Sequence, residues 1–411
     1  MDNHHCRFCG EKLKHTLIDL GLSPISTEYL SESDVSHGEW LFPLRVNVCG
    51  NCFLAQAEVY QMPANIFKKY AYFSSYSAGW LKHCKDYVDM IVPRLGLTPK
   101  SRVLEIASND GYLLQYFSPY QIPVLGIEPA ENIAVVARQK GIETRSCFFD
   151  CDMAQQIKEE NGTYDLVIGN NVLAHVPDIS GFVSGLSIVL APTGTITMEF
   201  PHLLELLKNT QFDTIYHEHF SYLSLLSVQT IFQKHGLDIY DVETLVTHGG
   251  SLRIYAGHAE FANNHRKDSV DILKKQELDF GMDRMQTYQD FARNALKIKL
   301  DTLSLISEIK AEGKHIAAFG AAAKGNTFLN YCGIKQDVVD YIVDDTPYKQ
   351  GLYLPGSLIP IVEFDMLRQS QPDYLLVLPW NWSEEIIEKT KFIREWGCKY
   401  ILCIPQVRVI E

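Results

Sequence analysis

The chain has 411 residues, 46% of them hydrophobic and 21% charged, which suits a globular protein of two or three domains. Its 37 basic and 50 acidic residues give a net charge of −13, which argues against a general nucleic-acid binder because phosphate backbones are repelled. The longest apolar runs are too short to span a membrane, and no basic segment followed by an apolar one marks a secretion signal. We therefore expect a cytoplasmic enzyme.

Four of the ten cysteines form two C-x-x-C pairs near the start of the chain. They are Cys6, Cys9, Cys49 and Cys52. In a long chain without a secretion signal, paired cysteines more often bind metal than form disulfides. Two such pairs can converge as a tetrahedron of thiolates, which leaves no open position for chemistry. We predict a structural Zn²⁺ in a small β-rich module over residues 1–70.

From residue 102 the chain alternates between short apolar segments and helical patterns. Predicted strands lie at 103–106, 124–127, 166–168 and 194–200. Segments with helical spacing lie at 80–92, 132–140 and 179–190. This alternation predicts an α/β fold with a doubly wound, Rossmann-like parallel sheet over residues 71–300, in which ligands bind beyond the carboxyl ends of the strands.

A polar stretch at 261–313 predicts one or two long helices that join this domain to a third unit. The third unit has predicted strands at 314–319, 338–343, 374–378 and 400–404, with a glycine-rich turn after the first. We predict a smaller Rossmann-like α/β domain over residues 301–411. Its turn matches neither G-x-G-x-x-G nor the P-loop, so a second dinucleotide site is not expected.

The turn after the strand at 103–106 has the features of a cofactor loop. Glu105 precedes it, Asn109 tolerates unusual backbone angles, and Gly111 lets the backbone come close to a ligand. Glu128 ends the next strand, where a carboxylate can accept hydrogen bonds from both ribose hydroxyls. The turn lacks G-x-G-x-x-G, which disfavours a dinucleotide. An ordinary βα unit without a cofactor is the alternative.

This turn and the acidic residue after the next strand resemble the class I S-adenosylmethionine-dependent methyltransferases. The resemblance implies S-adenosylmethionine as cofactor, with its adenine near residues 147–148 and its methionine end near residues 170–171. The cofactor contacts that it implies are Glu105, Ala107, Ser108, Asn109, Gly111, Tyr112, Glu128, Pro129, Cys147, Phe148, Asn170 and Asn171. Ala107 departs from the usual glycine of that family, which narrows the approach to the cofactor.

Further motifs follow in a specific order along the chain. They are YHEHFSYLS at 216–224, HGGSLR at 248–253, GAAAKGN at 320–326, YKQG at 348–351 and LPG at 354–356. With the cysteine pairs and the cofactor loop, they make the whole chain resemble the bacterial sugar C-methyltransferases. The resemblance implies methylation at C-3 of a nucleotide-diphosphate 4-keto-6-deoxyhexose, usually linked to thymidine diphosphate, in branched deoxysugar biosynthesis. We expect a monomer with a small-molecule substrate and with no nucleic-acid or membrane partner.

The first of these motifs carries the predicted catalytic residues. The resemblance implies that His219 is the base that removes the C-3 proton, with Glu218 or Tyr216 orienting it or the sugar. A ketone at C-4 acidifies that proton because the carbanion delocalises into an enolate, and an ordinary pKa of about 6.5 suits histidine to the task near neutrality. His175 and Tyr70 are predicted to line the same site, where either could donate to the enolate.

The residues alone leave two other interpretations of this motif open. His217 and His219 alternate, so on a strand they would share one face and could bind a metal. The segment could also be a polar strand without a chemical role.

Predicted substrate contacts come from several parts of the chain. They are Tyr72, Ser75, Tyr222, Lys324, Asn326 and Lys349. The resemblance implies that the C-terminal turn grips the diphosphate or the sugar through Lys324 or Asn326. The alternatives are a C-terminal domain that only closes over the site and an aromatic run at 70–76 that only fills the core.

Other functions stay open from the sequence. The same scaffold could methylate oxygen or nitrogen in another small metabolite. A zinc-knuckle nucleic-acid-binding protein with an accessory methyltransferase fold is an alternative of a different class, which the acidic charge disfavours. A binding protein without activity is opposed by the intact Glu105, Gly111, Glu128 and His219.

Overall fold

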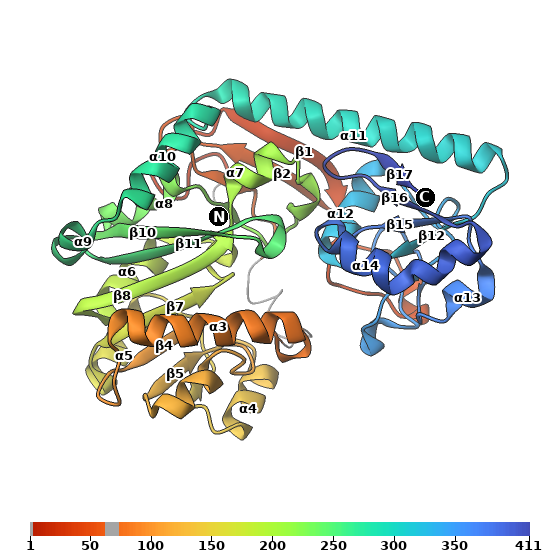
Figure 1. The fold of residues 1–411 in the computed structure, drawn as a ribbon. Coiled ribbons are helices and arrows are strands. Elements are labelled where there is room, and N and C mark those ends of the chain that lie inside the picture. The colour runs from red at the N-terminus through yellow and green to blue at the C-terminus, as the bar shows by residue number, and fades with distance from the viewer. Residues whose placement is uncertain (1–2, 62–73) are drawn as a thin grey trace.

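The computed structural model describes residues 3–61 and 74–411. In these ranges the chain forms three β-sheets flanked by helices, and one long helix runs across the molecule (Figure 1). No helix within the described ranges is long and apolar enough to cross a membrane. The predicted α/β fold class is confirmed.

The first sheet has four antiparallel strands in the order β1-β2-β3-β9. Its elements are β1 (His15–Ser23), α1 (Glu32–Val35), β2 (Phe42–Val48), β3 (Ala55–Ala57) and β9 (Ser221–Tyr222). The last strand comes from the middle of the chain, where Ser221 pairs with Gln56 and Tyr222 pairs with Ala55. The cysteine module is therefore joined directly to the segment that follows His219.

The second sheet has seven strands in the order β10-β11-β8-β7-β4-β5-β6. They are β4 (Val103–Ile106), β5 (Val124–Ile127), β6 (Thr144–Arg145), β7 (Tyr164–Asn170), β8 (Leu190–Pro201), β10 (Leu237–Leu245) and β11 (Ser251–His258). The strands β4 to β8 are parallel, as predicted, whereas β11 runs antiparallel to both β8 and β10. This antiparallel pair extends the sheet beyond the predicted strands.

Helices cover both faces of this sheet. They are α3 (Ala78–Leu95), α4 (Glu131–Gln139), α5 (Cys151–Asn161), α6 (Ile179–Val189), α8 (Leu225–Lys234), α9 (Ala259–His265) and α10 (Asp268–Phe280). The short helix α7 (Leu203–Lys208) packs instead in the apolar cluster that contains Leu17 of β1. In β4, Leu104 and Ile106 pack in one apolar cluster with Val183 of α6, whereas Val103 packs in another with Val88 of α3. Burial on both faces explains the uninterrupted apolar run of this strand.

The third sheet has the order β14-β13-β12-β15-β16-β17 and is parallel except for its last strand. Its strands are β12 (Ile316–Phe319), β13 (Ile342–Val343), β14 (Ile361–Val362), β15 (Tyr374–Val377), β16 (Lys399–Leu402) and β17 (Arg408–Ile410). Its helices are α12 (Ala323–Cys332), α13 (Met366–Ser370) and α14 (Ser383–Thr390). The strand predicted at 338–343 is shorter than expected.

The long helix α11 (Met285–Ala311) connects the second sheet to the third and packs against β1 and α12 (Figure 1). One buried apolar cluster contains Leu17 of β1, Phe291 of α11 and Phe328 of α12, so the first and third sheets share a core. Phe212 and Ile215 belong to the same cluster. The segment that leads to His219 is therefore anchored in this shared core.

Candidate active site

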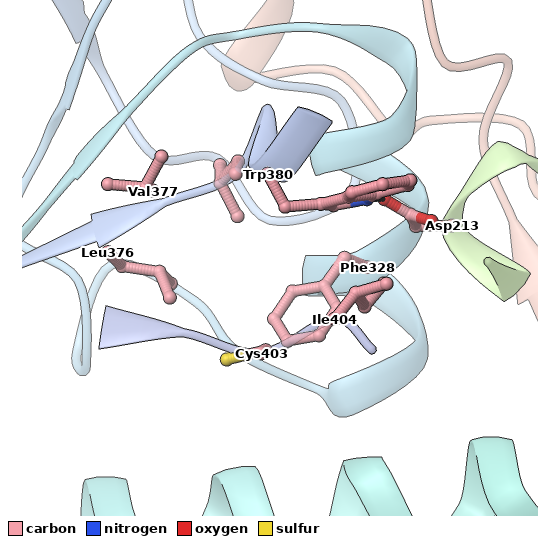
Figure 2. Close-up of a pocket in the computed structure, with 8 residues that line it drawn as sticks. Asp213, Phe328, Leu376, Val377, Trp380, Cys403 and Ile404 are labelled. Carbon is pink, nitrogen blue, oxygen red and sulfur yellow. Dashed lines mark hydrogen bonds between the residues drawn. The ribbon is translucent and has the colours of Figure 1, made fainter. Parts of the chain in front are cut away.

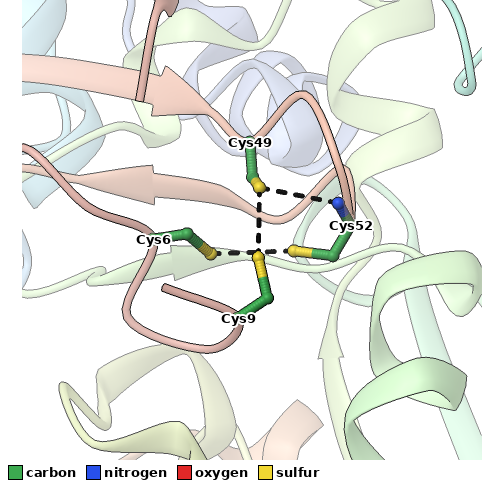
Figure 3. Close-up of side chains that lie close together, drawn as sticks. All are labelled: Cys6, Cys9, Cys49 and Cys52. Atoms are coloured by element: carbon green, nitrogen blue, oxygen red, sulfur yellow. Dashed lines mark hydrogen bonds between the residues drawn. The ribbon is translucent and has the colours of Figure 1, made fainter. Parts of the chain in front are cut away.

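The four predicted metal ligands meet in one cluster (Figure 3). Their sulfur atoms lie within 4.8 Å of one another, with 3.6 Å between Cys6 and Cys52 and 3.4 Å between Cys9 and Cys49. A tetrahedron with Zn–S bonds of about 2.3 Å has sulfur–sulfur edges of about 3.8 Å, so the cluster fits Zn²⁺. The hydrogen bond that Cys6 and Cys52 share lowers the pKa of the Cys6 thiol and raises that of Cys52, so the fit to Zn²⁺ rests on the positions of the four sulfur atoms.

The loop after β4 has an unusual backbone. Ala107 has a φ of 58° and Asn109 a φ of 48°, both in the left-handed region. Gly111 has a φ of 76°, and a Cβ there would lie 2.2 Å from Cδ1 of Ile142. The left-handed angle explains why glycine suits position 107, since a side chain there adds steric strain. Strain of this kind is typical of loops that clamp a ligand.

Two buried carboxylates flank this loop. Within the described ranges neither oxygen of Glu105 has a hydrogen-bond partner of ordinary geometry, and burial raises the pKa of Glu105 well above its usual value. Glu128 accepts the backbone N–H of Asn109 at 3.0 Å and that of Ala130, beyond Pro129, at 2.9 Å. Glu105 lies beside the hydroxyl of Tyr112, which interacts with it, and as a buried acceptor it fits the ammonium group of S-adenosylmethionine. A carboxylate at the end of β5 fits its ribose.

The other predicted residues of the loop are held by packing and by main-chain contacts. Ser108 lies against Gly126, where an added Cβ would come within 2.4 Å of the serine hydroxyl. The amide oxygen of Asn109 accepts the N–H of Ser74 at 3.0 Å. Tyr112 is buried beside Glu105. Packing and a main-chain hydrogen bond thus hold the residues of this loop in place.

Neighbouring loops complete this edge of the sheet. Asn170 is the last residue of β7, and Asn171 follows it with a φ of 53°. Cys147 and Phe148 follow β6, and Phe148 is 46% exposed. Because β4 to β7 are parallel neighbours, all these residues lie at the same carboxyl edge as Glu105. This edge is where the sequence predicts the cofactor.

His219 lies in a turn after a short 3-10 helix, η4 (Phe212–Thr214). Its Nδ1 lies 3.0 Å from the carbonyl oxygen of Thr214, and a carbonyl can only accept, so Nδ1 carries the proton and Nε2 keeps a lone pair. Burial lowers the pKa of His219 well below its usual value, and the nearby His175 lowers it further. A neutral imidazole with an accepting nitrogen is what a general base requires.

Two of the predicted partners lie against this ring. The ring centroid of Tyr216 is 4.0 Å away, and that of His175 is 4.8 Å away in an edge-on arrangement. Nδ1 of His175 lies 2.7 Å from the carbonyl oxygen of Glu218, and burial lowers the pKa of His175 to about 4. His175 is therefore neutral with its proton on Nδ1, so its Nε2 can only accept. The expectation that His175 donates to an enolate does not fit this geometry.

Two further predicted residues make other contacts than expected. The carboxylate of Glu218 accepts hydrogen bonds from Ser26 at 3.2 Å and Thr27 at 2.8 Å, both in the cysteine module. Ser75 donates to Asp110 in the cofactor loop. Glu218 therefore anchors the turn to the module instead of orienting the imidazole. Ser75 supports the cofactor loop.

Of the remaining predicted aromatic residues, the structure describes Tyr222. Tyr222 is buried in β9, with its ring centroid 6.2 Å from that of His219. Tyr70 and Tyr72 lie outside the described residues. Their predicted roles stay predictions.

The strand and metal interpretations of the histidine motif are wrong. Residues 217–218 form a turn, and the strand β9 begins only at Ser221. Nε2 of His217 lies 3.3 Å from the carbonyl oxygen of Pro43, and its ring packs against Phe42. The ring of His219 packs against His175 instead. Within the described ranges, clustered metal-ligand residues occur only at the four cysteines.

The predicted C-terminal contacts begin with Lys324, which is half-buried. Nζ of Lys324 donates to Oδ1 of Asn381 at 2.8 Å and lies 5.0 Å from the ring centroid of Trp380. Burial lowers the pKa of Lys324, an effect that the negative charge of Asp213 opposes. A half-buried ammonium beside the segment that carries His219 suits the binding of a negatively charged group.

The two other predicted residues of this domain contact residues of the same domain. Lys349 donates to the carbonyl oxygen of Ala321 at 3.0 Å and to Asp344 at 3.3 Å. Asn326 is fully buried, and its amide oxygen accepts a hydrogen bond from Asn330 at 3.1 Å. Lys349 therefore holds the turn that precedes α12, and Asn326 is part of the helix interior.

A polar network beside the cofactor edge, which includes the buried Glu199 and Arg253, was not predicted from the sequence. Glu199, at the end of β8, accepts hydrogen bonds from His83 at 2.9 Å and Arg253 at 2.8 Å. Nε2 of His248, an exposed residue, lies 3.2 Å from the side-chain amide of Asn171. Two of these residues belong to the HGGSLR motif, which was the available signal, although nothing in it predicted their partners.

Family models match three consecutive parts of the chain. They are a zinc binding domain at residues 6–67, a methyltransferase domain at 80–242 and a C-methyltransferase C-terminal domain at 246–405. The matches and the geometry define a class I S-adenosylmethionine-dependent methyltransferase with a zinc-binding module, which confirms both predicted cofactors.

Among known proteins, C-methyltransferase NovU from Streptomyces niveus is 38% identical over 406 residues, 99% of this chain and 96% of that protein. The chain therefore belongs to the same C-methyltransferase family, as its motif order predicted. Ubiquinone biosynthesis O-methyltransferase from Rhizobium etli is 26% identical over 154 residues, 36% of this chain and 60% of that protein. Magnesium protoporphyrin IX methyltransferase from Synechocystis, solved with bound SAM, has 18% identity and a TM-score of 0.34, covering 47% of this chain and 88% of that one.

Proposed function

We propose that this methyltransferase adds a methyl group to C-3 of a nucleotide-diphosphate 4-keto-6-deoxysugar, with thymidine diphosphate as the expected carrier. The observation that carries the proposal is the fixed tautomer of His219, whose Nδ1–H bonds the Thr214 carbonyl at 3.0 Å and leaves Nε2 as an acceptor. Transfer of a methyl group to oxygen requires a weaker base than transfer to carbon does. The match to NovU over nearly the whole chain supports transfer to carbon.

Carbon methylation depends on removal of a proton from C-3. A ketone at C-4 acidifies that proton, and Nε2 of His219 accepts it. The imidazolium that forms keeps its Nδ1–H bond to the carbonyl of Thr214, which stabilises the new charge. S-adenosylmethionine, when bound at Glu105 and Glu128, supplies the electrophilic methyl as a sulfonium. No catalytic metal is required of this chain.

The negative charge on the enolate oxygen needs a cation or a donor. His175 is held in an accepting tautomer and Tyr70 lies outside the described residues, so among the described side chains we assign this role to Lys324. An ammonium has three N–H donors, and one of them meets Asn381. The positive charge of Lys324 helps to lower the pKa of His219, so this charge is felt at the imidazole that we assign as the base. Tyr216 packs on the imidazole and limits its rotation.

The assignment is tested with His219→Ala and with His37→Ala as the control, because His37 is an exposed histidine of the cysteine module. Each enzyme is incubated in D₂O with a panel of nucleotide-linked 4-keto-6-deoxyhexoses, once without and once with S-adenosylmethionine. NMR then measures deuterium at C-3, and mass spectrometry measures methyl gain. We expect His219→Ala to lose both while it binds S-adenosylmethionine normally. Unchanged turnover would refute the role of His219, and a methyl found on oxygen or nitrogen would refute C-methylation of this substrate.

A further inference from the structure

The backbone of Phe220, the residue after His219, is held from two sides. The carbonyl oxygen of Phe220 accepts the backbone N–H of Ala57 at 3.0 Å and Nη1 of Arg7 at 2.8 Å. Its N–H donates to the carbonyl oxygen of Ala174 at 2.8 Å. One of these contacts comes from the cofactor edge, and the other two come from the cysteine module. The direction in which His219 points therefore depends on the module as well as on the methyltransferase sheet.

Arg7 lies inside the first metal knuckle, between two predicted ligands. Its backbone N–H donates to Oε1 of Gln56 at 3.0 Å, and Nε2 of Gln56 donates to the sulfur of Cys6 at 3.3 Å. Nη2 of Arg7 donates to the carbonyl oxygen of Ala57. Hydrogen bonds thus connect the sulfur cluster, through Gln56 and Arg7, to the carbonyl oxygen of Phe220. The guanidinium is also shielded from solvent, which strengthens both of its bonds.

We propose that Arg7 is a positioning residue for C-methylation, which uses the order of the metal-bound knuckle to fix the carbonyl of Phe220 and hence the aim of His219. The inference rests on the proposed function, because it takes His219 as the base. A guanidinium can bridge two carbonyl groups at fixed angles, and a shorter or single-point donor cannot. The four-sulfur site then contributes to turnover through geometry, although it has no position for substrate.

The size of the effect follows from the geometry that a base needs. A base must lie within hydrogen-bond reach of its proton, and a displacement of about 1 Å costs on the order of 10²-fold in rate. Loss of the Arg7 contact leaves Ala57 and Ala174 to hold Phe220, so the turn is loosened without being released. We therefore expect a fall in kcat with little change in the KM for S-adenosylmethionine, whose predicted site lies at Glu105 and Glu128.

The test compares Arg7→Ala and Arg7→Lys with Arg45→Ala. Arg45 is the matched control, because it is a half-exposed arginine of the same module that pairs with Asp19 at 2.7 Å. Zinc content, kcat, both KM values and amide hydrogen exchange are measured on the full-length zinc-loaded enzymes. The amides of His219 and Phe220 report the turn, since they bond the carbonyls of Tyr216 and Ala174.

We expect Arg7→Ala to keep its zinc, to exchange these two amides faster and to lose on the order of 10²-fold in kcat. Arg7→Lys should lose less, and Arg45→Ala should behave as the wild type. Wild-type exchange or wild-type kcat in a zinc-loaded Arg7→Ala enzyme overturns the proposal. If that variant loses zinc or does not fold, Arg7→Lys decides by the same two measurements.

The two proposals fail in different ways. Amide exchange at residues 219 and 220 tests the Arg7 contact whatever the base is. Wild-type turnover in His219→Ala overturns the base assignment, whether or not Arg7→Ala loosens the turn.

Discussion

Trp380 donates its indole N–H to Oδ2 of Asp213 at 2.7 Å, in the 3-10 helix that leads into the His219 turn (Figure 2). Thr327 of α12 adds a second bond to the same segment, from its hydroxyl to the carbonyl oxygen of Ile215 at 2.9 Å. The C-terminal domain therefore holds the start of the turn, while the cysteine module holds its end through β9. A short turn without regular structure can aim a base because separate parts of the chain fix both of its ends.

Replacing Trp380 with Phe should weaken this connection. Loss of the indole N–H leaves a buried oxygen of Asp213 without its donor, which costs about 1–3 kcal/mol in the free energy of unfolding. The control is Trp382→Phe, because Trp382 is 50% exposed in the same loop. Denaturant unfolding and kcat measure the two effects, and both should fall in Trp380→Phe alone. Equal stability of the two variants would show that the bond to Asp213 contributes nothing.

The activity should depend on pH through His219. The base works only when neutral, and burial, with the nearby His175, lowers the pKa of His219 well below its usual value of about 6.5. As the pH falls, the rate is lost only when the imidazole gains its proton, so kcat/KM should stay level down to pH 6.5 and decline below it. A pH–rate profile measures the midpoint. A midpoint at or above 6.5 contradicts the burial effect.

The charge of Lys324 offers a second test of the same site. Lys324→Gln removes a positive charge that helps to lower the pKa of His219, so the acid limb of kcat/KM should move to higher pH. This shift is separate from any fall in kcat that follows from loss of the enolate contact. Lys335→Gln, at an exposed lysine of the same domain, is the control and should leave the limb unchanged.

The sequence predicted those parts of the site that depend on regular structure. Glu105 and Glu128 lie near the ends of two short apolar strands, and adjacent parallel strands bring such ends together. The cysteine pairs could be recognised because the spacing of a knuckle is local. His219 itself was found by its motif, which says which residue matters and nothing about its surroundings.

The surroundings of His219 could not be predicted, because they are set by residues distant in sequence. The alternation of His217 and His219 fits a strand, yet the N–H of His219 closes a turn on Tyr216 and the next N–H goes to Ala174. That turn sends the two imidazoles to different neighbours. It also turns the carboxylate of Glu218 toward the cysteine module, which no local pattern shows.

The buried carboxylate of Glu277 should be important for stability. Glu277 of α10 accepts a hydrogen bond from Nε2 of His202 at 2.7 Å and from the backbone N–H groups of Leu225 and Leu226 at the start of α8. Glu277→Leu leaves these buried donors without an acceptor, so it should cost about 3–5 kcal/mol in the free energy of unfolding. Glu277→Gln keeps one acceptor and should cost less. Denaturant unfolding measures both, and an equal loss in the two variants contradicts this reason.

Glu105 should have opposite effects on stability and on cofactor affinity. Its buried oxygens lack ordinary hydrogen-bond partners in the described ranges, and such groups cost free energy in the folded protein. Glu105→Leu removes them, so the cofactor-free variant should be at least as stable as the wild type. It also removes the acceptor that we assign to the cofactor ammonium. A hydrogen bond to a charged group is worth about 1.5–3 kcal/mol, which corresponds to a loss of about 10- to 150-fold in affinity.

Denaturant unfolding without cofactor and calorimetric titration with S-adenosylmethionine separate these two effects. Glu159→Leu is the control, because Glu159 is an exposed carboxylate on α5 of the same domain, and it should change neither quantity. A Glu105→Leu protein that is less stable without cofactor, yet binds it as the wild type does, would mean that the carboxyl group serves the fold. The combination of unchanged or higher stability with weaker binding is specific to a site kept ready for its ligand, because a residue that only packs the core loses stability when it is replaced.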